Sequence, residues 1–170
     1  MGLKLNLGCG SELLHGYLNI DQGVRKRKGY KVLDANILEL NDHVVDNSVS
    51  EIRLRYVLEH IEFDMVPRFL WSMWKSLRLG GRLWILVPSI DSIYEKLVKN
   101  IKTREDFRIA NLELFGDTVD TVHRSFFTES MLCDILTSEG FFEIMSVIRN
   151  VGTRGCGMVV IAKKLPVVEG

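Results

Sequence analysis

The sequence predicts one α/β domain over residues 1–170, with a mainly parallel sheet and an antiparallel strand at its C-terminal end. Three observations favour this class. The length of 170 residues suits a single core, and 46% of the residues are apolar. The first strands follow one another through loops, whereas the later ones alternate with helices. No internal repeat or interdomain linker divides the chain.

Seven short runs have the composition and pattern of β-strands. The five expected to be mainly parallel are residues 3–7, 17–20, 30–33, 51–57 and 82–87. Asp21 and Asp34 directly follow the second and third of these runs. The last two runs, 142–148 and 158–163, flank a glycine-rich segment, which is typical of a hairpin-like connection.

Apolar residues at helical spacing predict the helices. The expected segments are 63–79, 91–101, 128–139 and part of the irregular stretch 103–121, with a break at Gly116. Pro67 suits the first turn of the first helix, and Gly80-Gly81 is expected to close it. Thr128 is the expected N-cap of the last helix, and Gly140 is its expected C-cap.

The spacing of the first three strands leaves little room for helices. A crossover between parallel strands usually contains a helix, but few residues separate Gly10 from Tyr17, and residues 22–29 have no apolar face. We therefore expect the helices after the first two strands to be reduced or absent. Because the first and fourth strands alternate, we also hypothesise a polar, largely uncovered sheet face around Lys4 and Arg53.

Charge and cysteine content exclude several classes of protein. The 22 basic residues balance the 22 acidic ones, so we expect no nucleic-acid or membrane partner. The three cysteines are far apart without a CxxC pair, so we predict no disulfide framework and no metal site. The sequence shows neither a signal peptide nor an apolar run of ~20 residues, which favours a cytoplasmic protein.

A glycine loop follows the first strand. Gly8 and Gly10 would let a ligand approach the backbone closely, and Asp21 ends the next strand, where a carboxylate can bind both ribose hydroxyls. The third glycine of a dinucleotide site is replaced by Leu13, and no helix begins there to bind a pyrophosphate. A nucleoside without phosphate is favoured over a dinucleotide. For the glycines alone, a simple tight turn is the alternative.

Further motifs surround this loop in a fixed order. They are Leu5-Asn6-Leu7-Gly8-Cys9-Gly10, Asn19-Ile20-Asp21, Leu33-Asp34-Ala35, Val57-Leu58-Glu59-His60, Leu79-Gly80-Gly81-Arg82-Leu83, Val87-Pro88 and Glu139-Gly140-Phe141. Together, over about residues 3–163, they resemble the class I S-adenosylmethionine-dependent methyltransferases, in particular the small type-11-like predicted methyltransferases. The resemblance implies a Rossmann-like class I methyltransferase fold and S-adenosylmethionine (SAM) as cofactor.

The resemblance also implies a set of cofactor-binding residues. They are Asn6, Gly8, Cys9, Gly10, Asp21, Gln22, Asp34, Ala35, Tyr56 and Glu59. Gly8 and Gly10 would lie under the methionine and ribose, and Asp21 would hold the ribose hydroxyls. Tyr56 would border the sulfonium and the acceptor pocket. Asn6 stands where this family commonly has an acidic residue, so we expect its contact with the cofactor's amino group to be weaker or indirect.

Methyl transfer from a sulfonium depends chiefly on holding donor and acceptor in line, and a base is needed only if the acceptor must lose a proton. His60 and His123 are the candidate catalytic bases. The alternative for His60 is a helix-start residue that bonds the backbone, and the alternative for His123 is likewise a structural role.

The resemblance predicts an enzyme that methylates a small-molecule or saccharide-type acceptor, with residues 91–121 forming the acceptor site or a lid. The alternative is a non-catalytic module that serves in assembly or regulation. An NAD-dependent reductase is a third interpretation, and we do not expect it. The uncovered sheet face makes a homodimer conceivable.

Overall fold

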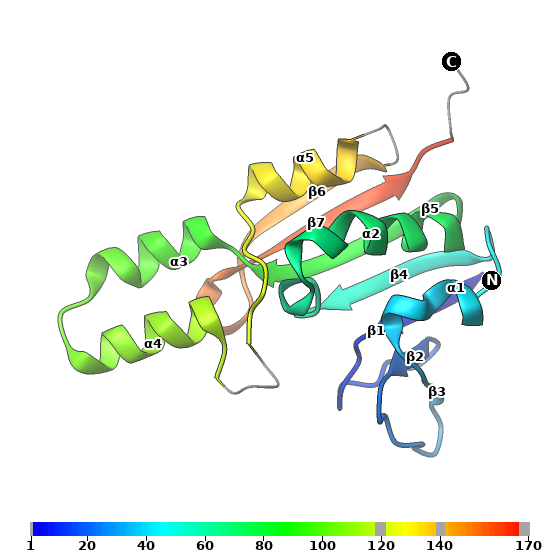
Figure 1. Ribbon diagram of the computed structural model, residues 1–170, viewed down its shortest axis with the longest axis horizontal. Coiled ribbons are helices and arrows are strands. Elements are labelled where there is room, and N and C mark those ends of the chain that lie inside the picture. Colours follow the sequence, from blue (N-terminus) through cyan, green and yellow to red (C-terminus); the bar gives the residue numbers. More distant parts are fainter. Residues whose placement is uncertain (1, 118–121, 139–141, 167–170) are drawn as a thin grey trace.

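The computed structural model describes residues 2–117, 122–138 and 142–166. Its sheet has seven strands in the order β3-β2-β1-β4-β5-β7-β6 (Figure 1). Their bounds are β1 Leu3–Leu7, β2 Leu18–Asp21, β3 Lys31–Asp34, β4 Val49–Arg55, β5 Leu77–Pro88, β6 Phe142–Val151 and β7 Gly157–Lys164. The neighbours from β3 to β5 pair in parallel, whereas β7 pairs antiparallel with both β5 and β6. The predicted sheet is confirmed.

The described helices alternate with the later strands. The α-helices are α1 Leu40–His43, α2 Val66–Ser76, α3 Ile90–Lys96, α4 Arg104–Phe115 and α5 Glu129–Thr137. The 3-10 helices are η1 Ile37–Glu39, η2 Leu58–His60, η3 Phe63–Met65, η4 Val98–Asn100 and η7 Thr153–Gly155. Residues 8–17 and 22–30 contain no helix, as their length and composition predict. Within 2–117, 122–138 and 142–166, no helix is long and apolar enough to cross a bilayer.

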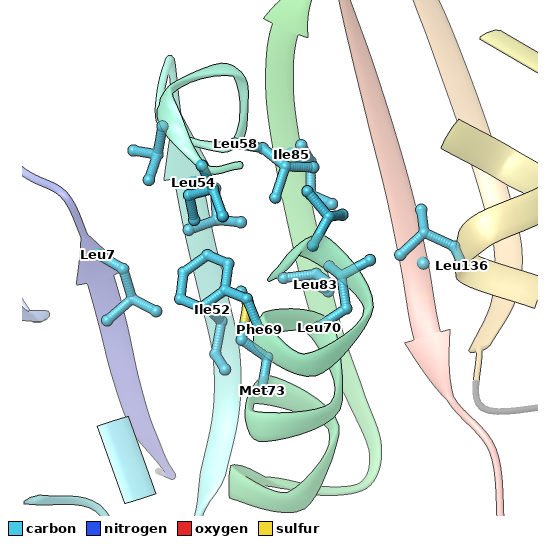
Figure 2. Close-up of a cluster of buried hydrophobic side chains, with 14 of the residues drawn as sticks. Leu7, Ile52, Leu54, Leu58, Phe69, Leu70, Met73, Leu83, Ile85 and Leu136 are labelled. Atoms are coloured by element: carbon cyan, nitrogen blue, oxygen red, sulfur yellow. The ribbon is translucent and has the colours of Figure 1, made fainter. Parts of the chain in front are cut away.

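One face of the sheet carries the core. Figure 1 shows α1, α2 and α5 together on this face, and Figure 2 shows Ile52, Leu54, Leu83 and Ile85 in the same buried cluster as Phe69 of α2. Each of these five side chains is at most 3% exposed. Burying a side chain of this size contributes about 1.5–3 kcal/mol, so this interface stabilises the fold.

The opposite face of the sheet is polar. Lys4, Glu51 and Arg53 point there because they alternate with the buried leucines and isoleucines of β1 and β4. Glu51 forms ion pairs with Lys4 at 3.9 Å and with Arg82 of β5 at 3.2 Å. Tyr17 also donates a hydrogen bond to Glu51. The hypothesis of a polar, uncovered face around Lys4 and Arg53 is confirmed.

The prediction that Gly80-Gly81 closes a helix is wrong. Helix α2 ends at Ser76, and Leu77 is already extended and begins β5. Pairing with β4 then jumps from Leu77 to Arg82, so the residues between them form a bulge. A Cβ on Gly81 would lie 2.8 Å from the Arg78 carbonyl oxygen and 3.1 Å from that of Val49, so Gly81 permits a close approach of the backbones, whereas Gly80 adopts a φ of 71°.

The helical hairpin α3–α4 projects beyond the sheet edge at which β4 and β5 end (Figure 1). Thr103 and Asp106 form a capping box at the start of α4. Gly116 ends α4 with a φ of 84°, so the predicted break is confirmed. The N-cap of α5 at Thr128 and the hairpin between β6 and β7 are confirmed as well. The predicted cap at Gly140, the Glu139-Gly140-Phe141 motif and residues 118–121 lie outside the described residues.

Candidate functional site

The glycine loop leaves β1 in a conformation that side chains disfavour. Gly8 has a φ of 61°, and its N–H donates to the Ile20 carbonyl oxygen at 2.9 Å. A Cβ on Gly8 would lie 2.5 Å from Cγ2 of Val57, so the position admits glycine only. Gly10 has a φ of 49°, but a Cβ there would meet nothing within 4 Å. The loop is therefore packed below Gly8 and open at Gly10.

Two carboxylates hold the loops that follow β1 and β2. The Asp21 carboxylate accepts hydrogen bonds from the N–H groups of Gly10 at 2.6 Å and Gln22 at 2.8 Å. Asp34 lies opposite Asp21 in the β2–β3 register and accepts from the Gly23 N–H at 2.8 Å. Each Asp21 oxygen uses one lone pair in this way and keeps a second for a ligand.

Ala35 and Gln22 complete the predicted residues at this end of the site. The Ala35 N–H donates to the Asp21 carbonyl oxygen at 3.2 Å, which joins the end of β3 to the end of β2. Ala35 is buried, whereas Gln22 is exposed. The structure thus brings Asp21, Gln22, Asp34 and Ala35 to one edge of the sheet, as the motifs imply.

Two neighbouring cavities border the glycine loop, and Gly10 and Ser11 line both. The first, of about 480 Å³, is lined by the predicted residues Asn6, Gly8, Cys9, Gly10 and Tyr56, together with Ser11, Glu12, Leu14, Arg53, Arg55 and Trp84. The second, of about 490 Å³, is lined by the predicted residues Gly10, Asp21 and Gln22, together with Ser11, Leu13 and residues 23–27. An elongated ligand lying along Gly10 would contact both cavities.

The side-chain amide of Asn6 forms hydrogen bonds that hold the glycine loop. Its amide nitrogen donates to the Glu12 carbonyl oxygen at 2.8 Å and to Oδ1 of Asn19 at 2.9 Å. That Asn19 oxygen also accepts from the Leu14 N–H at 2.7 Å. Because both side-chain amide hydrogens of Asn6 are used, only its side-chain oxygen Oδ1 can take part in a hydrogen bond with a ligand, as an acceptor.

The sequence motifs did not identify part of the lining of the first cavity. Arg53 lies over the Trp84 ring at 4.2 Å, and Arg55 forms an ion pair with Glu12, which also lines the cavity. These residues come from β4, β5 and the glycine loop. The alternation of basic residues along β4 signals that they share a face, but the sequence alone does not show that this face borders the loop.

Tyr56 has an unusual backbone conformation. Its φ is 54°, which ends β4 at Arg55, two residues earlier than predicted. The Tyr56 N–H donates to the Leu86 carbonyl oxygen at 2.9 Å, so the turn is anchored to β5. A bulky residue in the left-handed region stores strain, and such outliers gather at ligand sites.

Cys9 lies in the loop as a small buried residue. Burial, and next the nearby Asp21 charge, raise the pKa of the Cys9 thiol to about 11. The thiol is protonated at neutral pH and is a poor nucleophile. The geometry therefore agrees with a packing role for Cys9 in the loop.

The remaining predicted residues, Glu59, His60 and His123, lie together in a separate group. Glu59, His60 and His123 each offer one ligand-type atom, and these atoms lie within 4.8 Å of one another. Glu59 is 2% exposed, and burial raises the pKa of its carboxyl to about 8. Burial also lowers the pKa of His123 below its usual value, an effect opposed by its hydrogen bond with the Leu114 carbonyl. None of these three residues lines the two cavities beside the glycine loop.

Sequence comparison and structural comparison give different results. No protein-family model matches the sequence, and no curated protein matches it. A SAM-dependent methyltransferase from Methanosarcina mazei superposes on 96% of this chain and 92% of its own, with a TM-score of 0.62 and 20% identity. One from Mesorhizobium loti covers 96% and 91%, with a TM-score of 0.65 and 15% identity.

A third similar structure contains ligands. It is the 1,6-didemethyltoxoflavin-N1-methyltransferase of Burkholderia thailandensis, with bound 1,6-didemethyltoxoflavin and S-adenosylhomocysteine. It covers 97% of this chain and 72% of its own, with a TM-score of 0.66 and 15% identity. The chain therefore has the Rossmann-like α/β fold of the SAM-dependent methyltransferases, and the predicted resemblance is confirmed for the fold.

Proposed function

We propose that this protein binds SAM and transfers its methyl group to a small-molecule acceptor. The observation that carries the proposal is the glycine loop held by Asp21, with a cavity on each side of Gly10. This arrangement stands on the fold that SAM-dependent methyltransferases share.

The residues fit an elongated nucleoside with an amino-acid tail. The free lone pairs of Asp21 suit two vicinal ribose hydroxyls, and Gln22, Asp34 and Ala35 lie at the same sheet edge for an adenine ring. Gly8, Cys9 and Gly10 present backbone atoms to the centre of the ligand. Asn6 lines the first cavity, and its side-chain oxygen Oδ1 is the acceptor for the ammonium group of the ligand.

SAM, when bound, supplies a methyl group that is already activated on a sulfonium. The residues of the chain then have to position the acceptor and exclude water. Tyr56 and Trp84 provide aromatic walls for this purpose beside Gly8. A base is needed only for an acceptor that must lose a proton, and that role for His60 or His123 stays a prediction.

The composition of the first cavity supports a polar small molecule of saccharide type as acceptor. Its aromatic rings suit the apolar faces of a sugar, and Arg53, Arg55 and Glu12 can bond hydroxyl groups. The hairpin α3–α4 projects at the same sheet edge and would form the acceptor site or a lid. It is held to the β6–β7 connection by Lys96, which donates to the Gly155 carbonyl oxygen at 2.7 Å.

Titration calorimetry with S-adenosylhomocysteine tests the cofactor part of the proposal. We expect one binding site per chain, and no measurable heat of binding would overturn the proposal. A radiolabelled SAM assay with a panel of saccharides and other small polar acceptors tests the transfer. Binding of S-adenosylhomocysteine with no transfer to any acceptor would favour the alternative of a non-catalytic module.

A further inference from the structure

The cluster of Glu59, His60 and His123 combines three potential metal ligands from two distant parts of the chain. Glu59 and His60 lie in η2, directly after β4, and His123 lies in the segment that leads to α5. One carboxylate oxygen and two imidazole nitrogens lie within 4.8 Å of one another. Two imidazoles and one carboxylate form a donor set that transition metals bind in proteins.

The backbone fixes the two segments against each other. The N–H groups of Arg124 and Ser125 donate to the Glu59 carbonyl oxygen at 2.7 and 3.0 Å. The Ser125 hydroxyl donates to the Ile61 carbonyl oxygen at 2.5 Å. The position of His123 beside Glu59 is therefore built into the fold.

In each imidazole, Nδ1 is bonded to a backbone carbonyl oxygen, which leaves Nε2 as the nitrogen with a free lone pair. Nδ1 of His60 lies 3.1 Å from the Val122 carbonyl oxygen, and Nδ1 of His123 lies 2.9 Å from that of Leu114. A carbonyl oxygen only accepts hydrogen bonds, so each Nδ1 carries the proton and each Nε2 is unprotonated in the neutral ring. Metal-binding histidines are oriented in this way by their second nitrogen.

The Glu59 carboxyl group is buried, and its oxygens have no hydrogen-bond partner among the described residues. It is 2% exposed, and neither of its oxygens has a hydrogen-bond partner within 2–117, 122–138 and 142–166. Buried carboxylates without partners are rare because desolvation is expensive, and each one requires an explanation. A cation bound between Glu59 and the two histidines would supply that missing partner.

We propose that Glu59, His60 and His123 bind a divalent transition-metal ion of the Zn²⁺ type. The two nitrogen ligands favour such an ion over Mg²⁺ or Ca²⁺, which prefer oxygen. With bonds of about 2.0–2.2 Å, tetrahedral ligands lie roughly 3.3 Å apart, so side-chain rotations must draw the three atoms together by up to about 1.5 Å. Three protein ligands leave a fourth position open for water or a substrate donor atom.

The proposed metal ligands lie outside the lining of the two cavities, so metal binding and S-adenosylhomocysteine binding can be measured separately. Metal binding also changes the role expected for the two histidines. An ion bound to both Nε2 atoms would occupy the lone pairs that a general base requires. A metal-loaded protein therefore cannot use His60 or His123 as a base.

Titration calorimetry with ZnCl₂ tests the site on the full chain after dialysis against a chelator. We expect one Zn²⁺ per wild-type chain and a higher melting temperature with the metal. Glu59→Gln and His123→Gln should weaken the affinity by more than about 100-fold, because even a lost outer-shell partner costs 10–100-fold. The matched control is His43→Gln, since His43 is an exposed histidine of α1 and should leave the affinity unchanged.

Circular dichroism shows whether each variant folds. If Glu59→Gln does not fold, His60→Gln at the half-exposed position carries the same test. The absorption spectrum of a Co²⁺-substituted protein separates imidazole and carboxylate ligands from cysteine thiolates. Failure of the wild type to bind one Zn²⁺, equal binding by the cluster variants, or a thiolate spectrum would overturn the proposal.

Discussion

Asp21 is the single residue on which the proposed cofactor site depends most. Its carboxylate orders Gly10 and Gln22 and offers the remaining lone pairs to a ligand. We expect Asp21→Asn to weaken S-adenosylhomocysteine binding by about 10–100-fold, because a hydrogen bond to a charged group contributes about 1.5–3 kcal/mol. Titration calorimetry measures the change. Asp64→Asn, at an exposed position in η3, is the control and should bind as the wild type does.

The two glycines of the loop should differ in their tolerance of a methyl group. Gly8→Ala and Gly10→Ala both place alanine at a positive φ, which costs about 1–2 kcal/mol. Only the Gly8 variant also clashes with Val57, which adds about 1–3 kcal/mol of overpacking. Urea unfolding should therefore show the larger loss for Gly8→Ala, and equal losses would contradict the described packing.

Cys9 should react slowly with iodoacetamide in the folded protein. A thiol with a pKa of about 11 is ionised in roughly one molecule per thousand at pH 8, far less than a free cysteine. The rate should rise about tenfold per pH unit up to pH ~10, because only the thiolate reacts. Peptide mapping by mass spectrometry measures it, with the urea-unfolded chain as control. Rapid labelling of folded Cys9 at pH 7 would contradict this environment.

At the residue scale, the sequence predicted that the glycine loop and Asp21, which are close in the chain, belong to one site. Gly10 and Asp21 are joined because short strands with short loops must bring their ends together. The stacking of Arg53 on Trp84 and the approach of His123 to Glu59 join distant segments. Those contacts depend on strand order and on backbone bonds, which no local pattern contains.

At the scale of single elements, the helix caps allow a direct comparison. Thr103 caps the peripheral helix α4, whereas Thr128 caps α5, whose Leu132 and Leu136 are buried in the core. Thr103→Ala and Thr128→Ala should each cost about 1 kcal/mol, because an N-cap hydrogen bond is lost. For Thr103→Ala, hydrogen exchange should show faster exchange confined to α4. For Thr128→Ala, the loss should appear in the free energy of global unfolding. Serine at either position keeps the cap and is the control.

The errors at the element scale have local causes. The helix predicted to reach residue 79 ends at Ser76, because β5 takes Leu77 into its pairing with Val49. The short helix α1 has only four residues, too few for an apolar period to predict it. The other strand ends were predicted within three residues, since alternation and terminal glycines or aspartates mark them directly, whereas β5 begins five residues earlier than predicted.

At the scale of the whole molecule, the sheet should differ in stability from its centre to its edge. Strand β4 lies between β1 and β5 and under α2, whereas β3 is a four-residue edge strand that pairs only with β2. We expect the β4 and β5 amides to exchange hydrogen most slowly and the β3 amides to exchange early. Exchange followed by nuclear magnetic resonance measures this order, and equally slow exchange in β3 would contradict it.

The homodimer expected from the uncovered sheet face stays a prediction. That face carries the ion pairs of Glu51 with Lys4 and Arg82, which leaves it charged. Sedimentation velocity over a range of protein concentrations would measure the oligomeric state. A dimer that used this face should weaken as salt is added, because exposed charge pairs are screened.

The strand order also constrains how the protein is made. Strand β7 is seventh along the chain but lies between β5 and β6 in the sheet. On a ribosome, β5 waits for its neighbour while roughly 70 further residues are synthesised, which takes on the order of 4–14 s at 5–20 residues per second. Once β5 has left the ribosome, the N–H and C=O groups of the edge that pairs with β7 stay without a strand partner until β7 follows. Chaperones that bind nascent chains would therefore meet β5 before the sheet closes.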